Sequence, residues 1–125
     1  MADPIFIQPF PEVTTTITSA ATLALSGKTR GEIKELCFSV ENSGVTNALT
    51  AAVLQVRTQQ GGTFHTLISD WSTVSILMKF CSTALTTLAA EALSTCYVEI
   101  PPCAEWRLML TSASGTTAVC SGFGR

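Results

Sequence analysis

Hydrophobic and polar residues alternate regularly between positions 33 and 41 of the chain. One parity carries Leu36, Phe38 and Val40, and the other carries a cysteine, a serine and a glutamate. This period of two is typical of a half-buried β-strand, because successive side chains point to opposite faces of a sheet. Asn, Ser and Gly then follow one another at residues 42–44 and end the pattern. We therefore expect a strand over residues 33–41.

The next run predicts a β-hairpin. Within residues 47–58, Ala52, Leu54 and Val56 fall on one face. The four residues QQGG at 59–62 are typical of a turn, and residues 63–69 return as a second strand.

Further strands are expected from β-branched runs and from shorter alternating runs. They cover residues 13–25, 73–80, 96–100, 106–110 and 116–123. Together the pattern predicts an all-β fold: an antiparallel β-sandwich or jelly roll of about seven to nine short strands.

One segment fits two interpretations. Residues 82–93 carry leucines and alanines at helical spacing, with Ser82 available as an N-cap. The same residues fit a strand followed by an alanine-rich loop. We favour irregular or strand structure here.

The first twelve residues, MADPIFIQPFPE, differ from the rest of the chain. They contain three prolines, which hold a chain extended and exclude it from the interior of a sheet. They also carry large apolar side chains that gain by being covered: Ile5, Phe6, Ile7 and Phe10. We predict an extended N-terminal arm over residues 1–12, in which these four residues make an interface, and a β-sandwich domain over residues 13–125.

Composition limits the partners. Hydrophobic residues make up 46% of the chain and charged residues only 13%, against about 25% charged in a usual soluble domain. The 19 threonines and 12 serines supply the polar surface instead. The formal net charge is −2 and the seven Lys and Arg residues are scattered. We expect no nucleic-acid partner, because phosphate binding needs clustered basic side chains.

The chain shows no targeting pattern and no metal-binding pattern. It has no apolar run of about 18 residues, so we expect no membrane span. No secretory signal is visible at its start, so we expect synthesis in the cytoplasm. The five cysteines have no C-x-x-C spacing and there is one histidine. We therefore expect free thiols, no metal and no cofactor.

Catalytic arrangements are also weakly supported. A serine-type triad would need His65 with Asp3 or Asp70, yet no G-x-S-x-G turn exposes a serine. No pair of carboxylates stands out as an acid and base across a cleft. We expect that the protein is not an enzyme.

Three aromatic residues are candidates for a sugar-stacking platform: Trp71, Tyr97 and Trp106. Aromatic residues in or beside strands more often fill a core, because they bury the most area. We favour the core interpretation.

The order of strands and turns resembles a known group. Four stretches carry the likeness: VENSG at 40–44, IPP at 100–102, WRL at 106–108 and SASGTT at 112–117. Over residues 33–125 the chain resembles small β-sandwich virion proteins of tailed bacteriophages. The resemblance implies a part of a virus particle, such as a capsid decoration (cement) protein or a tail component.

Two hypotheses follow. In the first, the chain is a structural virion protein, a capsid decoration protein that stabilises a phage shell. Its partners are then copies of itself in a homo-oligomer and a major capsid or other virion protein, and its location is the virion. In the second, it is a carbohydrate- or receptor-binding β-sandwich module of a tail. Exposed tryptophans would favour the second hypothesis.

Overall fold

The computed structural model describes residues 7–29, 33–72 and 74–125 of the chain. Within these residues it has nine strands and one turn of 3-10 helix, η1 (Leu85–Thr87). The strands are β1 (Gln8–Ile17), β2 (Thr22–Lys28), β3 (Glu35–Asn42), β4 (Ala51–Arg57), β5 (His65–Ile68), β6 (Met78–Cys81), β7 (Leu93–Glu99), β8 (Glu105–Thr111) and β9 (Thr116–Gly124).

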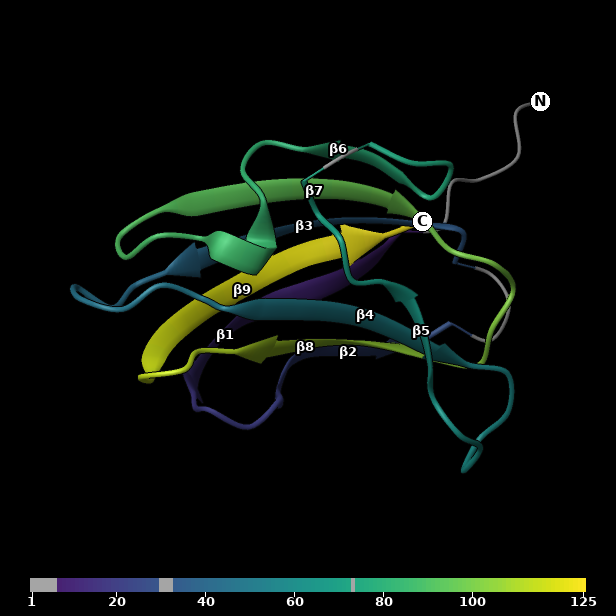
Figure 1. Ribbon diagram of the computed structural model, residues 1–125. Coiled ribbons are helices and arrows are strands. Elements are labelled where there is room, and N and C mark those ends of the chain that lie inside the picture. Colours follow the sequence, from purple (N-terminus) through teal and green to yellow (C-terminus); the bar gives the residue numbers. More distant parts are fainter. Residues whose placement is uncertain (1–6, 30–32, 73) are drawn as a thin grey trace.

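The strands form two antiparallel sheets that face each other (Figure 1). One sheet has the order β1-β9-β3-β7-β6 and the other has the order β2-β8-β4-β5. Consecutive strands such as β1 and β2, or β8 and β9, therefore lie in opposite sheets. This alternation gives a jelly roll, with β6 added at one edge. The predicted all-β sandwich is confirmed.

The alternating residues form the core between the sheets. In β3, Leu36, Phe38 and Val40 are at most 2% exposed. The matching positions in β4 and β8 are buried in the same way. Burying each such side chain contributes roughly 1.5–3 kcal/mol, so the strand pattern also supplies much of the stability.

Both tryptophans belong to this core. Trp71 is 1% exposed and Trp106 is 0% exposed. The Trp71 indole N–H donates a hydrogen bond to the carbonyl of Ala52 at 2.8 Å, and its ring meets that of Phe38 edge-on. The core interpretation of the tryptophans is confirmed.

The strand expected over residues 73–80 is shorter than predicted. Within the described residues β6 begins only at Met78. Before it, the Ser75 hydroxyl accepts a hydrogen bond from the Met78 N–H, and the Ser75 N–H donates to the Met78 carbonyl, each at 3.0 Å. This turn replaces strand pairing, because a serine side chain competes for backbone groups.

Residues 82–93 are mostly irregular, as favoured. Only Leu85–Thr87 form a helical turn, and β7 begins at Leu93. Leu85 and Leu88 are buried, and the Leu88 carbonyl accepts a hydrogen bond from the Leu49 N–H at 2.9 Å. The leucine spacing thus reflects burial against the sandwich, not an α-helix.

The expected N-terminal arm is described from Ile7 onward, and there it differs from the prediction. Gln8 and Pro9 already pair with β9, where Pro9 lies opposite Phe123. The register shifts between Phe10 and Val13, around Pro11. An edge strand tolerates prolines, particularly at a bulge, because its outer side makes no ladder hydrogen bonds. Strand β1 therefore begins at Gln8, inside the range expected for the arm.

Candidate functional site

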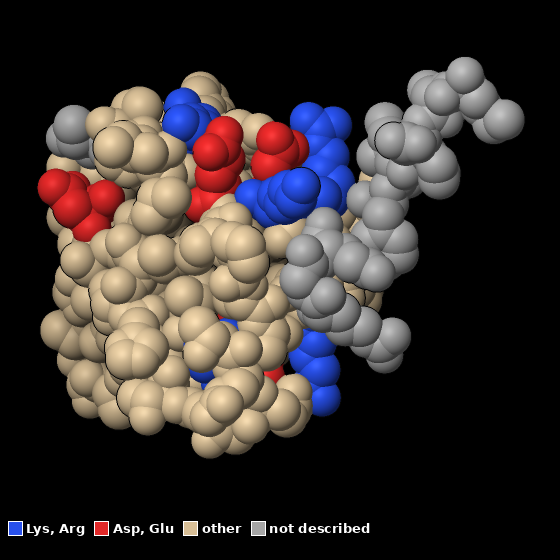
Figure 2. Space-filling view, turned by 90° about the vertical axis from the view of Figure 1, so that its right-hand side faces the viewer, with Lys and Arg blue, Asp and Glu red and all other residues tan. Residues whose placement is uncertain are grey.

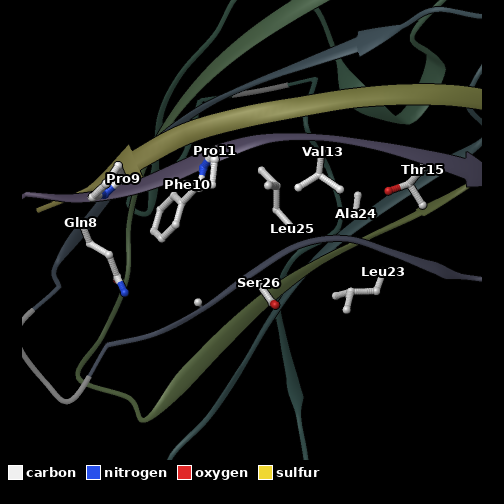
Figure 3. A pocket seen from close by; sticks show the side chains of 11 residues that line it. Gln8, Pro9, Phe10, Pro11, Val13, Thr15, Leu23, Ala24, Leu25 and Ser26 are labelled. Carbon is white, nitrogen blue, oxygen red and sulfur yellow. The ribbon is translucent and has the colours of Figure 1, made fainter.

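A groove of about 420 Å³ lies on the surface between β1 and β2 (Figure 3). We call it the β1–β2 groove. It is lined by Gln8, Pro9, Phe10, Pro11, Val13, Thr15, Leu23, Ala24, Leu25, Ser26 and Gly27. Most of these side chains are apolar, so the groove favours an apolar occupant.

The groove arises from the topology. β1 is the edge strand of the five-stranded sheet and β2 is the edge strand of the four-stranded sheet. The chain crosses between the sheets in residues 18–21, which brings the two edges side by side. Within the described residues neither strand has a strand partner on its outer side. Such edges are ready templates for another chain.

An aromatic pair forms the floor. The rings of Phe10 and Trp106 meet edge-on, with centroids 4.9 Å apart and an interplanar angle of 70°. Gly27 leaves the space for this pair, because a Cβ added there would lie 2.7 Å from the Trp106 Nε1 atom. The floor thus depends on a residue without a side chain.

Two buried polar atoms near this floor have no hydrogen-bond partner among the described residues. They are the Oε1 atom of Gln8 and the Nε1 atom of Trp106, one acceptor and one donor. A buried polar group without a partner costs about 1–3 kcal/mol.

The rim of the groove is exposed and apolar. Leu23 is 48% exposed and Val13 is 43% exposed, and Pro9 and Pro11 are exposed farther along β1. A run of exposed apolar side chains along a strand edge indicates a contact surface.

The predicted interface residues fall in different places. Ile7 is 56% exposed at the start of the described chain, beside the groove. Phe10 is 7% exposed and belongs to the core of its own chain. Ile5 and Phe6 lie outside the described residues. An outward contact role is therefore compatible with the position of Ile7, whereas Phe10 anchors β1.

A second surface crosses the outer face of the five-stranded sheet. The strand register aligns one residue from each strand, in the order Pro9, Phe123, Cys37, Tyr97 and Phe80. Phe80 is 52% exposed and Phe123 is 38% exposed. We call these five residues the aromatic row, after the three of them that are aromatic. Sequence reasoning identified only Tyr97, because the row depends on pairing between distant strands.

Charged side chains lie beside the aromatic row near its middle strand, β3. Arg125 and Glu35 form an ion pair at 2.7 Å. The Tyr97 hydroxyl hydrogen-bonds to the Glu35 carboxylate, and with Arg125 it lowers the pKa of that carboxyl below its ordinary value. Figure 2 shows charges gathered in one part of the visible face, while most of that face carries none.

Two other basic residues are engaged in the other sheet. The guanidinium groups of Arg57 and Arg107 lie 4.7 Å and 3.9 Å from the centroid of the Phe64 ring. Arg57 also pairs with Glu105 at 2.6 Å. Partners of this kind hold the two arginines against their own chain.

The residues considered for catalysis are not assembled. His65 is exposed in β5, and the Asp70 carboxylate accepts hydrogen bonds from Ser72, not from His65. These Ser72 bonds lower the pKa of Asp70. Asp3 lies outside the described residues.

Two further features are absent from the part of the chain that the structure describes. No group of three or more His, Cys, Asp or Glu side chains in that part of the chain could hold a metal ion. None of its helices is long and apolar enough to cross a membrane.

Comparison with known proteins gives one structural likeness. No family model matches the chain, and no curated protein matches it. The crystal structure of YomS, a protein derived from the SPBc2 prophage, is similar with a TM-score of 0.50 and 9% sequence identity. The match covers 98% of this chain and 99% of that one. At this identity the likeness shows a shared fold.

Proposed function

We propose that the protein is a structural component of a bacteriophage particle, and specifically a capsid decoration (cement) protein that stabilises the shell. It is made in the host cytoplasm and incorporated into the virion. Its partners are copies of itself and a major capsid or other virion protein. It performs no catalysis in this role, and it needs no cofactor, nucleic acid or membrane.

The β1–β2 groove is the observation that carries this proposal. Among the described residues it brings two unpartnered sheet edges and an exposed apolar rim close to Ile7, where the described chain begins. A particle subunit works by covering such surfaces with its neighbours. The shared fold with a prophage-derived protein supports the same assignment by analogy, as does the use of jelly rolls in viral capsids.

The occupant of the groove is residues 2–7 of a neighbouring copy. Its side chains Ile5, Phe6 and Ile7 are large and apolar, like most of the groove lining. Six extended residues span at most about 20 Å, which is enough to reach across a subunit boundary.

Burial of the N-terminal segment should contribute a modest free energy for each subunit and a large one for the whole assembly. Burying the side chains of Ile5 and Phe6 contributes roughly 1.5–3 kcal/mol each. Repetition around a closed ring adds these contributions for every copy. The arm would then determine whether the oligomer is stable.

A second candidate function rests on the aromatic row. Phe80 and Phe123, which are exposed, and Tyr97, which is half-buried, could bind a receptor or a carbohydrate, as expected of a tail component. The burial of both tryptophans removes the strongest sugar-stacking residues from this candidate. Its test is a glycan-binding screen of the full chain, with Tyr97→Ala as the matched variant.

The deciding experiment uses particles of the phage that carries the gene. Mass spectrometry of purified particles should detect the chain in many copies, and gold-labelled antibodies should mark the shell. A phage replication protein serves as the negative control. Labelling confined to the tail would favour the second candidate, and a chain absent from washed particles would contradict both.

A further inference from the structure

Two cysteine side chains meet across the strands β6 and β7. Cys81 ends β6 and lies directly opposite Cys96 in β7. Their Sγ atoms are 3.4 Å apart. Cys81 is half-buried and Cys96 is buried, so one sulfur of the pair is reachable from solvent.

The local register suits a covalent link. The Ser82 N–H donates to the Thr95 carbonyl at 3.0 Å, so Ser82 and Thr95 form a hydrogen-bonded pair of the ladder. The preceding pair, Cys81 and Cys96, is then a non-hydrogen-bonded pair. In such pairs the Cα atoms are about 4.5 Å apart, which falls inside the range of about 4.4–6.8 Å that a disulfide spans.

We propose that Cys81 and Cys96 are a redox-sensitive pair that closes into a disulfide when the protein meets an oxidising environment. β6 is an edge strand of four residues whose ladder partner is β7. The disulfide clamps the end of this strand to β7. It also closes the loop that contains η1.

The step is a thiol–disulfide exchange with a low-molecular-weight disulfide as the oxidant. The Cys81 thiolate attacks one sulfur of the oxidant, which forms a mixed disulfide and releases one small thiol. The Cys96 sulfur then attacks the Cys81 sulfur and displaces the second small thiol. The two protons of the cysteine thiols end on the two released thiols, so the protein is oxidised by two electrons and the oxidant is reduced by two.

The surroundings set the order of attack. Burial raises the pKa of the Cys96 thiol, and the neighbouring Cys81 raises it further. Cys96 is therefore a poor first nucleophile. The Cys81 thiol donates a hydrogen bond to the Thr83 carbonyl at 3.0 Å and is the sulfur that an external disulfide can reach.

This inference does not depend on the proposed function. In reducing surroundings the five cysteines stay thiols, and the pair closes where the surroundings are oxidising. Failure of the disulfide to form would leave the particle assignment untouched, and absence from particles would leave the thiol pair untouched.

The test is thiol counting before and after incubation of the folded chain with oxidised glutathione. Titration in denaturant should fall from five thiols to three, because two of the five sulfurs are consumed. Cleavage after Glu91 and Glu99 separates Cys81, Cys96 and Cys103 onto different peptides. Mass spectrometry should then find the first two joined. The melting temperature should rise on the order of 10 °C.

Matched variants make the result specific. Cys96→Ser lacks the second attacking sulfur, so oxidation should stop at a mixed disulfide of Cys81 with glutathione, with no disulfide inside the chain and no rise in melting temperature. Cys37→Ser removes another half-buried thiol and should still lose two. Five thiols remaining in the oxidised wild type, or a bond that joins any other cysteines, would overturn the proposal.

Discussion

Phe10 packs edge-on against Trp106 with ring centroids 4.9 Å apart, and this contact joins an edge strand of one sheet to an inner strand of the other. Phe10 belongs to β1 and Trp106 to β8. The pair closes the sandwich beneath the β1–β2 groove. It also anchors the proline-containing start of β1 to the core.

The Phe10→Ala substitution tests this contact. Removing a buried phenylalanine leaves a cavity, so the free energy of unfolding should fall by about 3–5 kcal/mol. Urea denaturation followed by tryptophan fluorescence measures the change. The control is Phe80→Ala, which removes a ring that is 52% exposed and should cost only about 0.5 kcal/mol. Equal effects of the two substitutions would show that Phe10 does not anchor β1.

Two truncations test where the domain begins. Removing residues 2–7 leaves β1 whole, so the melting temperature should stay within about 2 °C of the full chain. Removing residues 2–12 takes away Gln8, Pro9 and Phe10 and should lower it markedly. Thermal unfolding by circular dichroism compares the two. If both truncations were equally stable, the boundary expected from the prolines, at residue 12, would be the correct one.

The loss of folding stability at acid pH should depend on Glu35. Its hydrogen bond from Tyr97 and its pairing with Arg125 lower its pKa from the ordinary value of 4.5. Ionised Glu35 therefore stabilises the fold above pH 4.5, and this contribution is lost as the pH falls through the lowered pKa. The free energy of unfolding should fall less steeply below pH 4.5 in Glu35→Gln than in the wild type.

Tyr97→Phe provides an intermediate case for the same measurement. It removes the largest cause of the lowered pKa and leaves Arg125 in place. Its acid dependence should lie between the other two. Identical curves for all three proteins would mean that the Glu35 interactions contribute nothing to folding.

The core strands were predictable because their signal is local. Leu36, Phe38 and Val40 alternate within one strand, and burial follows directly from that period. The sequence also favoured irregular or strand structure over a helix for residues 82–93, and most of these residues are irregular. The strand over 73–80 was overestimated because the hydrogen bonds of Ser75 with Met78 outweigh its β-branched composition.

The candidate sites could not be predicted because they depend on pairing between distant strands. The β1–β2 groove requires knowing that both strands are edges. The thiol pair requires the register of β6 on β7, including the irregularity between Met78 and Phe80. The burial of Phe10 requires its contact with Trp106, which is 96 positions away in the sequence. No local pattern contains this information.

The central claim is that the N-terminal segment of one copy occupies the β1–β2 groove of another. The most direct measurement is the solution mass by light scattering, over a range of concentrations, for three proteins: the full chain, the truncation of residues 2–7, and Leu23→Asp. The full chain should form multiples of its 13.2 kDa mass. The truncation lacks the occupant, and Leu23→Asp places a charge on the groove rim, so both should stay folded and monomeric. A full chain that is monomeric at every concentration, or a truncation that assembles equally well, would contradict the account.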